Sequence, residues 1–294
     1  MNKKLAFVLS GGGSHGAMQV GALRALLENG YHPDLVTGSS IGAANGAFLA
    51  VHGFNLQGIQ MLEQVWRSTI DQDLLPMNLW WQTMQAVFKG AKGFSQQRIR
   101  EFAITNGLTP DLCFRDLKGI ELHPVAADLN AGSQVIFGSD PDELVLESVL
   151  ASMSLPPWMA PMEKNGRYLV DGGAVSNLPI EAALQMGATE IIALDLFDSD
   201  ETSAAARGFS GFFLKLDMTV EHRQAQLEMK LAEARGVPVM RVSLVCERPV
   251  PFWDFRQSVE LIERGYHLTT RSIAAWKRKK AMGDMIEGFL EALE

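Results

Sequence analysis

Short apolar runs that end in glycines and lead into helical stretches constrain the fold of this chain most strongly. Residues 5–9 are continuously apolar and end in three glycines, and residues 17–29 carry apolar side chains at helical spacing before Gly30. The same alternation continues to residue 196. Short buried strands that alternate with helices are typical of α/β folds. We therefore predict an α/β fold with a mostly parallel central sheet flanked by helices.

The remaining elements are predicted from the same patterns. We expect strands at residues 34–37, 125–128, 134–137, 168–170, 191–196 and 239–245, and helices at residues 41–51, 143–153, 180–186 and 219–234. The polar stretch at residues 198–208 is typical of a surface loop. We therefore expect a core at residues 1–198 and a mostly helical extension at residues 199–294 that packs on the same domain.

Composition excludes several classes of protein. The chain has 294 residues, of which 47% are hydrophobic and 20% charged, as in ordinary globular proteins. A net charge of −8 argues against binding to nucleic acid. The two cysteines, Cys113 and Cys246, are too few for a disulfide framework or a zinc site. No apolar run approaches the roughly 18–20 residues that span a bilayer. The apolar run after Lys3-Lys4 is also too short for a secretory signal peptide.

A first glycine-framed site lies between the first strand and the first helix. Its sequence, Gly11–Gly16, matches the G-x-G-x-x-G pattern of dinucleotide-binding folds. That pattern requires an acidic residue at the end of the second strand, whereas Asp34 lies at its start. A dinucleotide-binding oxidoreductase is therefore kept only as an alternative. A glycine-rich turn at a helix N-terminus also exposes backbone N–H groups, which can hold an oxyanion.

A second site, Gly38-Ser39-Ser40-Ile41-Gly42, fits the pattern G-x-S-x-G. It follows a predicted strand and precedes a predicted helix, which is the context of a nucleophile elbow. Gly38 and Gly42 allow the strand and the helix to approach without a Cβ clash. We predict that Ser40 is a nucleophile. A small-residue turn with Ser40 as a helix cap is the structural alternative.

A third site, Asp171-Gly172-Gly173, follows the predicted strand at residues 168–170. A carboxylate at the end of a strand, with glycines that clear space, can receive a proton from a serine. In a Ser-Asp-His hydrolase a histidine would follow the aspartate. The candidates, His222 and His267, both lie in charged helical stretches rather than in loops after strands. His15 lies within the glycine turn, and we expect it at the surface near the start of the helix, with contact to the substrate as the alternative.

Together the three sites resemble those of the patatin-like phospholipases, a family of lipid acyl hydrolases. The motifs occur in the order of that family: Gly11–Gly16, Gly38–Gly42 and Asp171–Gly173. Residues 19–23 resemble the first helix of the family, and residues 151–157 followed by residues 171–179 resemble the stretch around its catalytic aspartate. The resemblance covers about residues 5–198, and the chain as a whole is similar to the stand-alone bacterial members of the family. His15 departs from it, because the family usually has Lys or Arg there.

The resemblance implies a three-layer architecture and a Ser–Asp dyad without a histidine, a metal or a cofactor. Ser40 would attack an acyl ester and form an acyl-enzyme, while Asp171 would accept its proton. Backbone N–H groups of Gly11, Gly12 and Gly13 would hold the oxyanion. Burial raises the pKa of a carboxylate and strengthens its hydrogen bond, which is consistent with direct proton transfer. The glycines expected to support these turns are Gly16, Gly38, Gly42, Gly172 and Gly173.

Two apolar stretches are candidates for contact with lipid. One is a helical stripe of Trp80, Met84, Val87 and Phe88, and the other is a cluster of Phe209, Phe212, Phe213, Leu214 and Leu216. Ordinary core packing is the simpler interpretation of each. A lid or an interfacial patch is the functional one, because aromatic residues serve at lipid surfaces.

These observations lead to one interpretation with alternatives. We expect a serine acyl hydrolase that acts on lipid or other acyl esters, is cytoplasmic and contacts membranes peripherally. We expect no nucleic acid partner, and the sequence sets neither the oligomeric state nor the lipid head group. A Ser-Asp-His hydrolase, a dinucleotide-binding oxidoreductase and a catalytically silent regulatory protein stay as alternatives.

Overall fold

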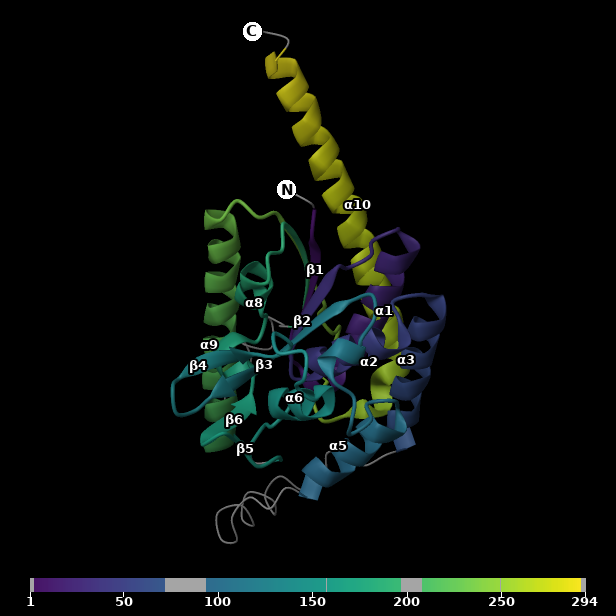
Figure 1. The fold of residues 1–294 in the computed structure, drawn as a ribbon. Coiled ribbons are helices and arrows are strands. Elements are labelled where there is room, and N and C mark those ends of the chain that lie inside the picture. Colours follow the sequence, from purple (N-terminus) through teal and green to yellow (C-terminus); the bar gives the residue numbers. More distant parts are fainter. Residues whose placement is uncertain (1–2, 72–93, 157, 197–207, 249, 292–294) are drawn as a thin grey trace.

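Eight short strands pair into one sheet within the part of the chain that the structure describes (Figure 1). The computed structural model describes residues 3–71, 94–156, 158–196, 208–248 and 250–291. The strands are β1 (Leu5–Leu9), β2 (Leu35–Ser39), β3 (Glu121–Asp128), β4 (Ser133–Ile136), β5 (Met162–Lys164), β6 (Arg167–Asp171), β7 (Glu190–Asp195) and β8 (Val239–Ser243).

The strands β3, β2, β1, β7 and β8 are consecutive parallel neighbours, so their carboxyl ends share one edge of the sheet. The strands β4 and β6 both run antiparallel to β3, and β5 pairs with β6. The sheet is therefore mostly parallel, as predicted. In open α/β sheets, ligands bind at the carboxyl edge of the parallel strands. That edge is consequently the first place to look for a functional site.

Helices cover both faces of the sheet (Figure 1). Their bounds are α1 (Gly16–Glu28), α2 (Ile41–His52), α3 (Leu56–Ser68), α5 (Phe94–Thr105), α6 (Val145–Ser152), α7 (Gly173–Ser176), α8 (Ile180–Gln185), α9 (Gly208–Ala234) and α10 (Ser258–Glu291). In Figure 1, α1, α3 and α10 lie on one side of the sheet, while α8 and α9 lie on the other. The structure therefore has the three layers that were expected.

The side chains of β1 show how the sheet joins the two layers. Phe7 and Leu9 are buried in the core cluster that includes α1 and α3, whereas Ala6 and Val8 are buried in the cluster that includes α8 and α9. Successive side chains of a strand point to opposite faces. A strand with apolar residues at every position is therefore buried on both faces, which is why the continuous run predicted a parallel sheet.

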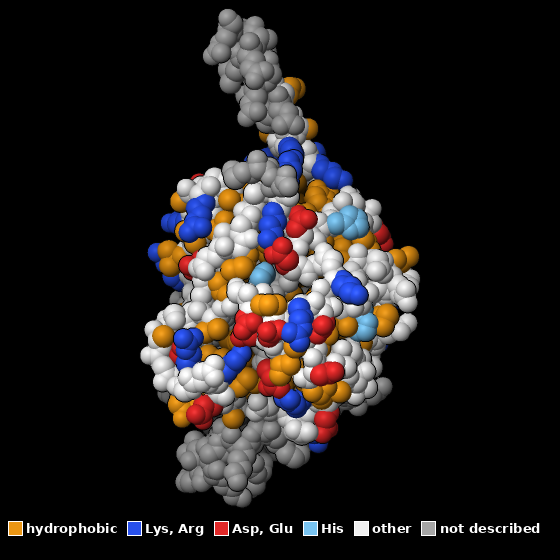
Figure 2. All heavy atoms as spheres, in the orientation of Figure 1, with side chains coloured by type: hydrophobic (Ala, Val, Ile, Leu, Met, Phe, Trp, Pro, Cys, Tyr) orange, Lys and Arg blue, Asp and Glu red, His pale blue; other side chains and the backbone are white. Residues whose placement is uncertain are grey.

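The predicted elements agree with the structure except at their ends. β2 ends at Ser39, two residues beyond the predicted strand, and α9 begins at Gly208 rather than at residue 219. The predicted surface loop at residues 198–208 lies almost entirely outside the described residues. None of the helices that the structure describes is long and apolar enough to cross a membrane. On the face drawn in Figure 2, basic and acidic side chains are interspersed.

The start of α2 can pack against β1 only because residue 42 is a glycine. A Cβ placed on Gly42 would lie 2.2 Å from the carbonyl oxygen of Leu9, which is backbone and cannot move aside. We expect Gly42→Ala to lower the free energy of unfolding by at least about 1–3 kcal/mol, the cost typical of overpacking. Urea unfolding followed by circular dichroism measures this.

Gly46→Ala in the same helix is the matched control. Its Cβ would meet a side-chain atom, Val36 Cγ1 at 2.8 Å, and alanine favours a helix over glycine by up to about 1 kcal/mol. The Gly46 variant should therefore lose much less stability than the Gly42 variant. Equal losses would show that the close approach to β1 is not the limiting contact.

Candidate active site

Ser40 occupies a strained turn between β2 and α2. Its φ of 52° and ψ of −123° lie outside the regions that L-residues prefer, and Asn165 is the only other non-glycine residue with positive φ in the described ranges. Such a conformation costs about 1–3 kcal/mol and persists only where the surroundings impose it. The N–H of Ser40 donates to Ser152 Oγ at 3.0 Å, and Ser152 Oγ donates to the Val125 carbonyl at 2.6 Å. The end of α6 therefore fixes the turn.

The direction of this turn follows from the way β2 and β6 share one side of β3. Val125 and Ala126 both pair with β4 on one side. Each strand residue has one neighbour on each side, so their other partners lie along the opposite side. These partners are Ser39, at the end of β2, and Asp171, at the end of β6. The carboxyl ends of β2 and β6 thus meet end to end, and β2 cannot continue past Ser39.

This meeting places Ser40 and Asp171 next to each other. Ser39 and Asp171 are opposite consecutive residues of β3, so their side chains point to opposite faces of the sheet. Ser40 follows Ser39 in the strained turn, so it lies beside the end of β6 that carries Asp171. Gly172 follows Asp171 and lies on the face of Ser39, where a Cβ would come within 2.5 Å of Ser39 Oγ. The close contact of Gly172 with Ser39 is consistent with this assignment of faces.

The carboxylate of Asp171 is buried and held by the backbone. The residue is 5% exposed, and its Oδ1 accepts the N–H of Gly173 at 2.9 Å. The N–H of Asp171 donates to the carbonyl of Ser154 at 2.9 Å. A Cβ on Gly173 would lie 3.2 Å from Asp171 Oδ1, so the glycine allows the short turn that fixes the carboxylate.

The glycine turn lies beside Ser40. A Cβ on Gly11 would be 3.2 Å from Ser40 Cβ and 2.4 Å from Asn177 Oδ1. The N–H of Gly11 already donates to the backbone oxygen and to Oδ1 of Asn177, both at 3.1 Å. Of the three predicted oxyanion donors, Gly11 is therefore engaged within the protein. In the ranges that the structure describes, the N–H groups of Gly12 and Gly13 donate to no protein acceptor.

Sequence reasoning missed two side chains that assemble the site. Asn177 joins the segment after Asp171 to the glycine turn, and Ser152 joins α6 to the Ser40 turn. Both residues lie in stretches that resembled the family, yet neither carries a motif of its own. Their partners are 166 and 112 residues away in the chain, so no local pattern announces them.

The structure shows the positions of the three histidines that the sequence singled out. The expectation of a surface position for His15 is wrong, because the residue is only 8% exposed and its Nε2 lies 2.6 Å from the Val250 carbonyl. His222 lies on α9, 2.8 Å from Gln226, and His267 is exposed on α10. His267 lies beside Tyr266, whose hydroxyl donates to Glu28 in the last turn of α1.

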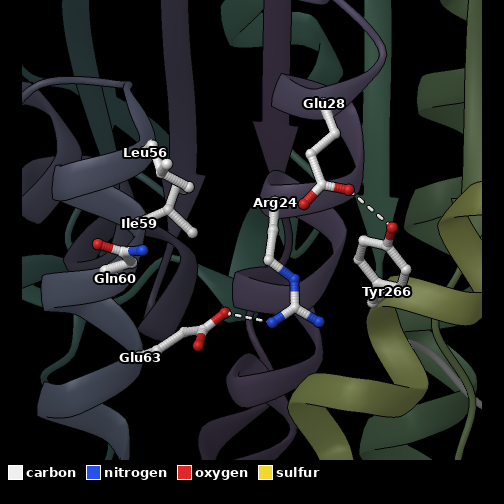
Figure 3. Close-up of a pocket in the computed structure, with 7 residues that line it drawn as sticks. All are labelled: Arg24, Glu28, Leu56, Ile59, Gln60, Glu63 and Tyr266. Atoms are coloured by element: carbon white, nitrogen blue, oxygen red, sulfur yellow. Dashed lines mark hydrogen bonds and ion pairs between the residues drawn. The ribbon is translucent and has the colours of Figure 1, made fainter.

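A surface cavity of about 360 Å³ lies elsewhere, between α1, α3 and α10 (Figure 3). The polar side chains that line this cavity interact with one another. Arg24 pairs with Glu63 at 2.7 Å and stacks on Tyr266, whose hydroxyl donates to Glu28 at 2.7 Å. Arg24 and Glu28 lie in the second half of α1, whereas the glycine turn precedes its first residue. This cavity is therefore separate from the candidate active site.

The apolar stretches proposed for lipid contact are described only in part. The stripe of Trp80, Met84, Val87 and Phe88 lies outside the described residues. Of the second cluster, Phe212 and Leu216 are described on α9 and are 62% and 51% exposed. The side chains of the other three members of the cluster also lie outside the described part of the chain.

A buried carboxylate supports the segment that follows Asp171. Glu228 of α9 accepts hydrogen bonds from the hydroxyl of Ser176, in α7, and from the N–H of Glu181 at 2.5 Å, at the start of α8. The pKa of Glu228 is raised to about 7, mainly by burial; the hydrogen bonds from Ser176 and from the Glu181 N–H lower it, and the charge of Glu181 adds to the rise. This side chain is placed to respond to pH near neutrality.

Comparisons with known proteins identify the family to which the chain belongs. Residues 7–184 match the model of a family described as patatin-like phospholipase. The chain is 30% identical to patatin-like phospholipase domain-containing protein 7 of Rattus norvegicus, over 96% of this chain and 22% of that protein. It is 31% identical to neuropathy target esterase sws of Drosophila melanogaster, over 71% of this chain and 14% of that protein. VipD from Legionella pneumophila, a solved structure, has a TM-score of 0.48 and 15% identity, over 94% of this chain and 67% of that one.

A three-layer α/β fold with a strained G-x-S-x-G serine at the carboxyl edge of its sheet is typical of serine ester hydrolases. The chain belongs to the patatin-like phospholipase family, as the family match shows. It spans about a fifth of the length of the curated relatives it matches, or less. Membership in this family sets aside the dinucleotide-binding alternative.

The raised pKa of Glu228 predicts a pH-dependent stability. Its ordinary value is 4.5 and its value in the folded protein is about 7, so folding favours the protonated form. The stabilisation is complete below about pH 4.5 and is lost as the pH rises through about 7. In Glu228→Gln the amide oxygen can still accept the N–H of Glu181, and the amide nitrogen can donate to the Ser176 hydroxyl, without this titration. We expect the free energy of unfolding of the variant, relative to that of the wild type, to rise by up to about 3 kcal/mol from pH 4.5 to pH 7.5.

Urea unfolding at several pH values measures this difference. Glu233→Gln, which removes an exposed carboxylate from the same helix, is the control and should run parallel to the wild type. A Glu228→Gln curve that also runs parallel to the wild type would contradict the prediction.

Proposed function

We propose that the protein hydrolyses fatty acyl esters of lipids through Ser40 and Asp171, in the manner of a phospholipase A. The observation that supports this proposal is the end-to-end meeting of β2 and β6, which brings the Ser40 turn and the end of β6 together beside the glycine turn. The names of the relatives, a phospholipase domain protein and an esterase, support the reaction class.

In the proposed reaction, Ser40 Oγ attacks the ester carbonyl while its proton passes to Asp171. The oxygen of the tetrahedral intermediate becomes negative and accepts hydrogen bonds from the N–H groups of Gly12 and Gly13. The intermediate then collapses, the acyl–oxygen bond breaks, and the leaving alcohol takes the proton from Asp171. Water attacks the Ser40 acyl-enzyme in the second half of the reaction, and Asp171 again accepts and returns the proton.

A dyad is favoured over a triad by the position of the histidines. Asp171 and the residue before Ser40 pair with consecutive residues of β3, whereas none of the candidate histidines lies on these strands. His222 and His267 lie on α9 and α10, and His15 is engaged with the Val250 carbonyl. A Ser-Asp-His hydrolase and a catalytically silent protein are the outcomes that the experiment below would reveal.

We further propose that the first half of α9 touches a lipid surface. Phe212, Leu216 and Val220 recur every four residues and are 62%, 51% and 45% exposed. The stripe runs toward the candidate active site, since a Cβ on Gly173 would lie 3.3 Å from Glu221 Oε1. Exposed apolar side chains at such a site suit a substrate that is held in a membrane.

We also propose that residues 199–294 belong to the same catalytic unit as residues 1–198. Two contacts support this: β8 pairs with β7 along five residues, and residues 250–252 bond to the glycine turn.

The dyad predicts which substitutions abolish activity. A fluorophosphonate probe should label Ser40, and Ser40→Ala should lose both labelling and ester hydrolysis. Asp171→Asn keeps the shape of the side chain but removes the basic carboxylate, so its kcat should approach that of Ser40→Ala. Losses of this kind typically exceed about a thousandfold. Hydrolysis of a soluble short-chain ester gives kcat, and circular dichroism checks folding.

His222→Ala and His267→Ala are the controls, and each should stay within a few-fold of the wild type. A collapse of activity in either well-folded variant would assign the protein to the triad class. Labelling of Ser39 or Ser14 instead of Ser40 would overturn the nucleophile, and an inert wild type would favour the silent protein.

Contact of α9 with lipid predicts a loss that depends on the substrate. Phe212→Ser combined with Leu216→Ser should lower hydrolysis of vesicle phospholipid by about tenfold, because each exposed apolar side chain contributes to binding at the interface. Hydrolysis of the soluble ester should not change. Leu227→Ser removes a side chain that is 49% exposed further along the same helix and should lower neither activity. Equal loss on both substrates would contradict the proposal.

A further inference from the structure

The segment at residues 250–252, which leads from β8 towards α10, faces the glycine turn with three consecutive carbonyl groups. The Val250 oxygen lies 2.6 Å from His15 Nε2. The Pro251 oxygen accepts the Ser14 hydroxyl at 3.1 Å, and the Phe252 oxygen accepts the Ser14 N–H at 2.7 Å. Two residues of the turn are thus bonded to a segment about 235 residues away.

These contacts reach the proposed oxyanion donors. A Cβ on Gly13 would lie 2.3 Å from the Phe252 oxygen, so this carbonyl rests directly against Gly13. Gly12 and Gly13 have φ values of 157° and 56° and precede α1, so α1 does not hold their N–H groups. Their direction is set by what the turn is bonded to on either side. On one side this is Asn177, and on the other it is the 250–252 segment.

The 250–252 segment is itself held in place. The Pro251 oxygen also accepts the N–H of Asp254 at 2.8 Å, which closes a turn, and the Asp254 carboxylate pairs with Arg256 at 2.7 Å. The ring of Phe252 packs edge-on against Trp158 at 5.2 Å between centroids. A carbonyl held this way offers a fixed point to a side chain that reaches it.

We propose that His15 is a positioning residue that fixes the oxyanion donors by bonding the glycine turn to the Val250 carbonyl. The inference rests on the proposed function, because it concerns the geometry of that reaction. The carbonyl can only accept, so Nε2 of His15 donates the proton. His15 is nearly fully buried, and its bond closes the three-carbonyl contact at the start of α1.

Two amide substitutions of His15 test whether the hydrogen bond to Val250 matters, or only the presence of a polar side chain at this position. The amide nitrogen of Gln reaches the position of Nε2, so His15→Gln can still donate to Val250. The nitrogen of Asn reaches only the position of Nδ1, so His15→Asn cannot. Removing an oxyanion donor typically costs about 10²–10³ in kcat. Because His15→Asn loosens the donors without removing them, we expect a loss in kcat of about 10- to 100-fold on a soluble ester.

The remaining readouts distinguish positioning from general stability. KM should change little, because the ground-state ester makes weaker use of the donors than the oxyanion does. The Ki of an alkyl trifluoromethyl ketone, which forms a tetrahedral oxyanion on the serine, should rise in proportion to the loss in kcat/KM. His15→Gln should return kcat and Ki to within a few-fold of the wild type. Ser14→Ala, which removes only the bond to Pro251, should show a smaller loss of the same kind.

His123 provides a matched control. It is 5% exposed, and its Nδ1 lies 2.9 Å from the Phe137 carbonyl, outside the proposed site. His123→Gln removes this bond, since the Gln nitrogen does not occupy the Nδ1 position. The variant should lose stability without losing kcat per folded molecule.

Three outcomes would overturn the inference: an unchanged kcat in His15→Asn, a similar loss in His123→Gln, or failure of His15→Gln to restore activity. The proposed function fails separately, if the wild type hydrolyses esters without dependence on Ser40. If activity depends on Ser40 while His15→Asn is as active as the wild type, only the positioning role is wrong.

Discussion

The candidate active site depends on the point where the carboxyl ends of β2 and β6 meet. β2 and β6 approach each other along the same side of β3, and neither can extend further. After β2 the chain leaves the sheet through the strained turn at Ser40, and after β6 it leaves through the Asp-Gly-Gly turn. A parallel and an antiparallel neighbour on one side of a strand thus bring together residues 131 positions apart. The nucleophile and the acid–base group proposed here are consequences of this arrangement, because the register of both strands along β3 decides which residues stand at the point where they meet.

The rest of the site is built by groups that hold backbone in place. Ser152 accepts the N–H of Ser40, and Asn177 accepts the N–H of Gly11. The 250–252 segment accepts hydrogen bonds from Ser14 and His15. Donors that are fixed before the reaction do not have to be reorganised during it, and in many enzymes such preorganisation accounts for most of the rate enhancement. The strain at Ser40 is tolerable for the same reason, since its surroundings over-determine it. In this fold, rigidity at the carboxyl edge is supplied from three separate stretches of the chain.

The opposite layer of helices is coupled to the same edge. Glu228 of α9 binds Ser176 in the turn after Asp171 and the start of α8, and its pKa near 7 makes this link sensitive to pH. The first half of α9 meanwhile carries exposed apolar side chains. One helix therefore joins a candidate lipid contact to the segment that holds the proposed proton acceptor. The charged cavity between α1, α3 and α10 has no such link, and its side chains satisfy one another.

The sequence alone determined the parallel sheet, the two strand-to-helix turns and the candidates Ser40 and Asp171. Each depends on local chemistry: continuous apolar runs make buried strands, and glycines permit close approach and positive φ. Only the tertiary structure decided that Gly11 is engaged by Asn177, that His15 is buried, and that residues 250–252 complete the glycine turn. These features join residues separated by 166 and 235 positions, and a hydrogen bond to a backbone carbonyl requires no particular residue type at the accepting end. Such contacts leave no pattern in the sequence, because the fold alone brings their two ends together.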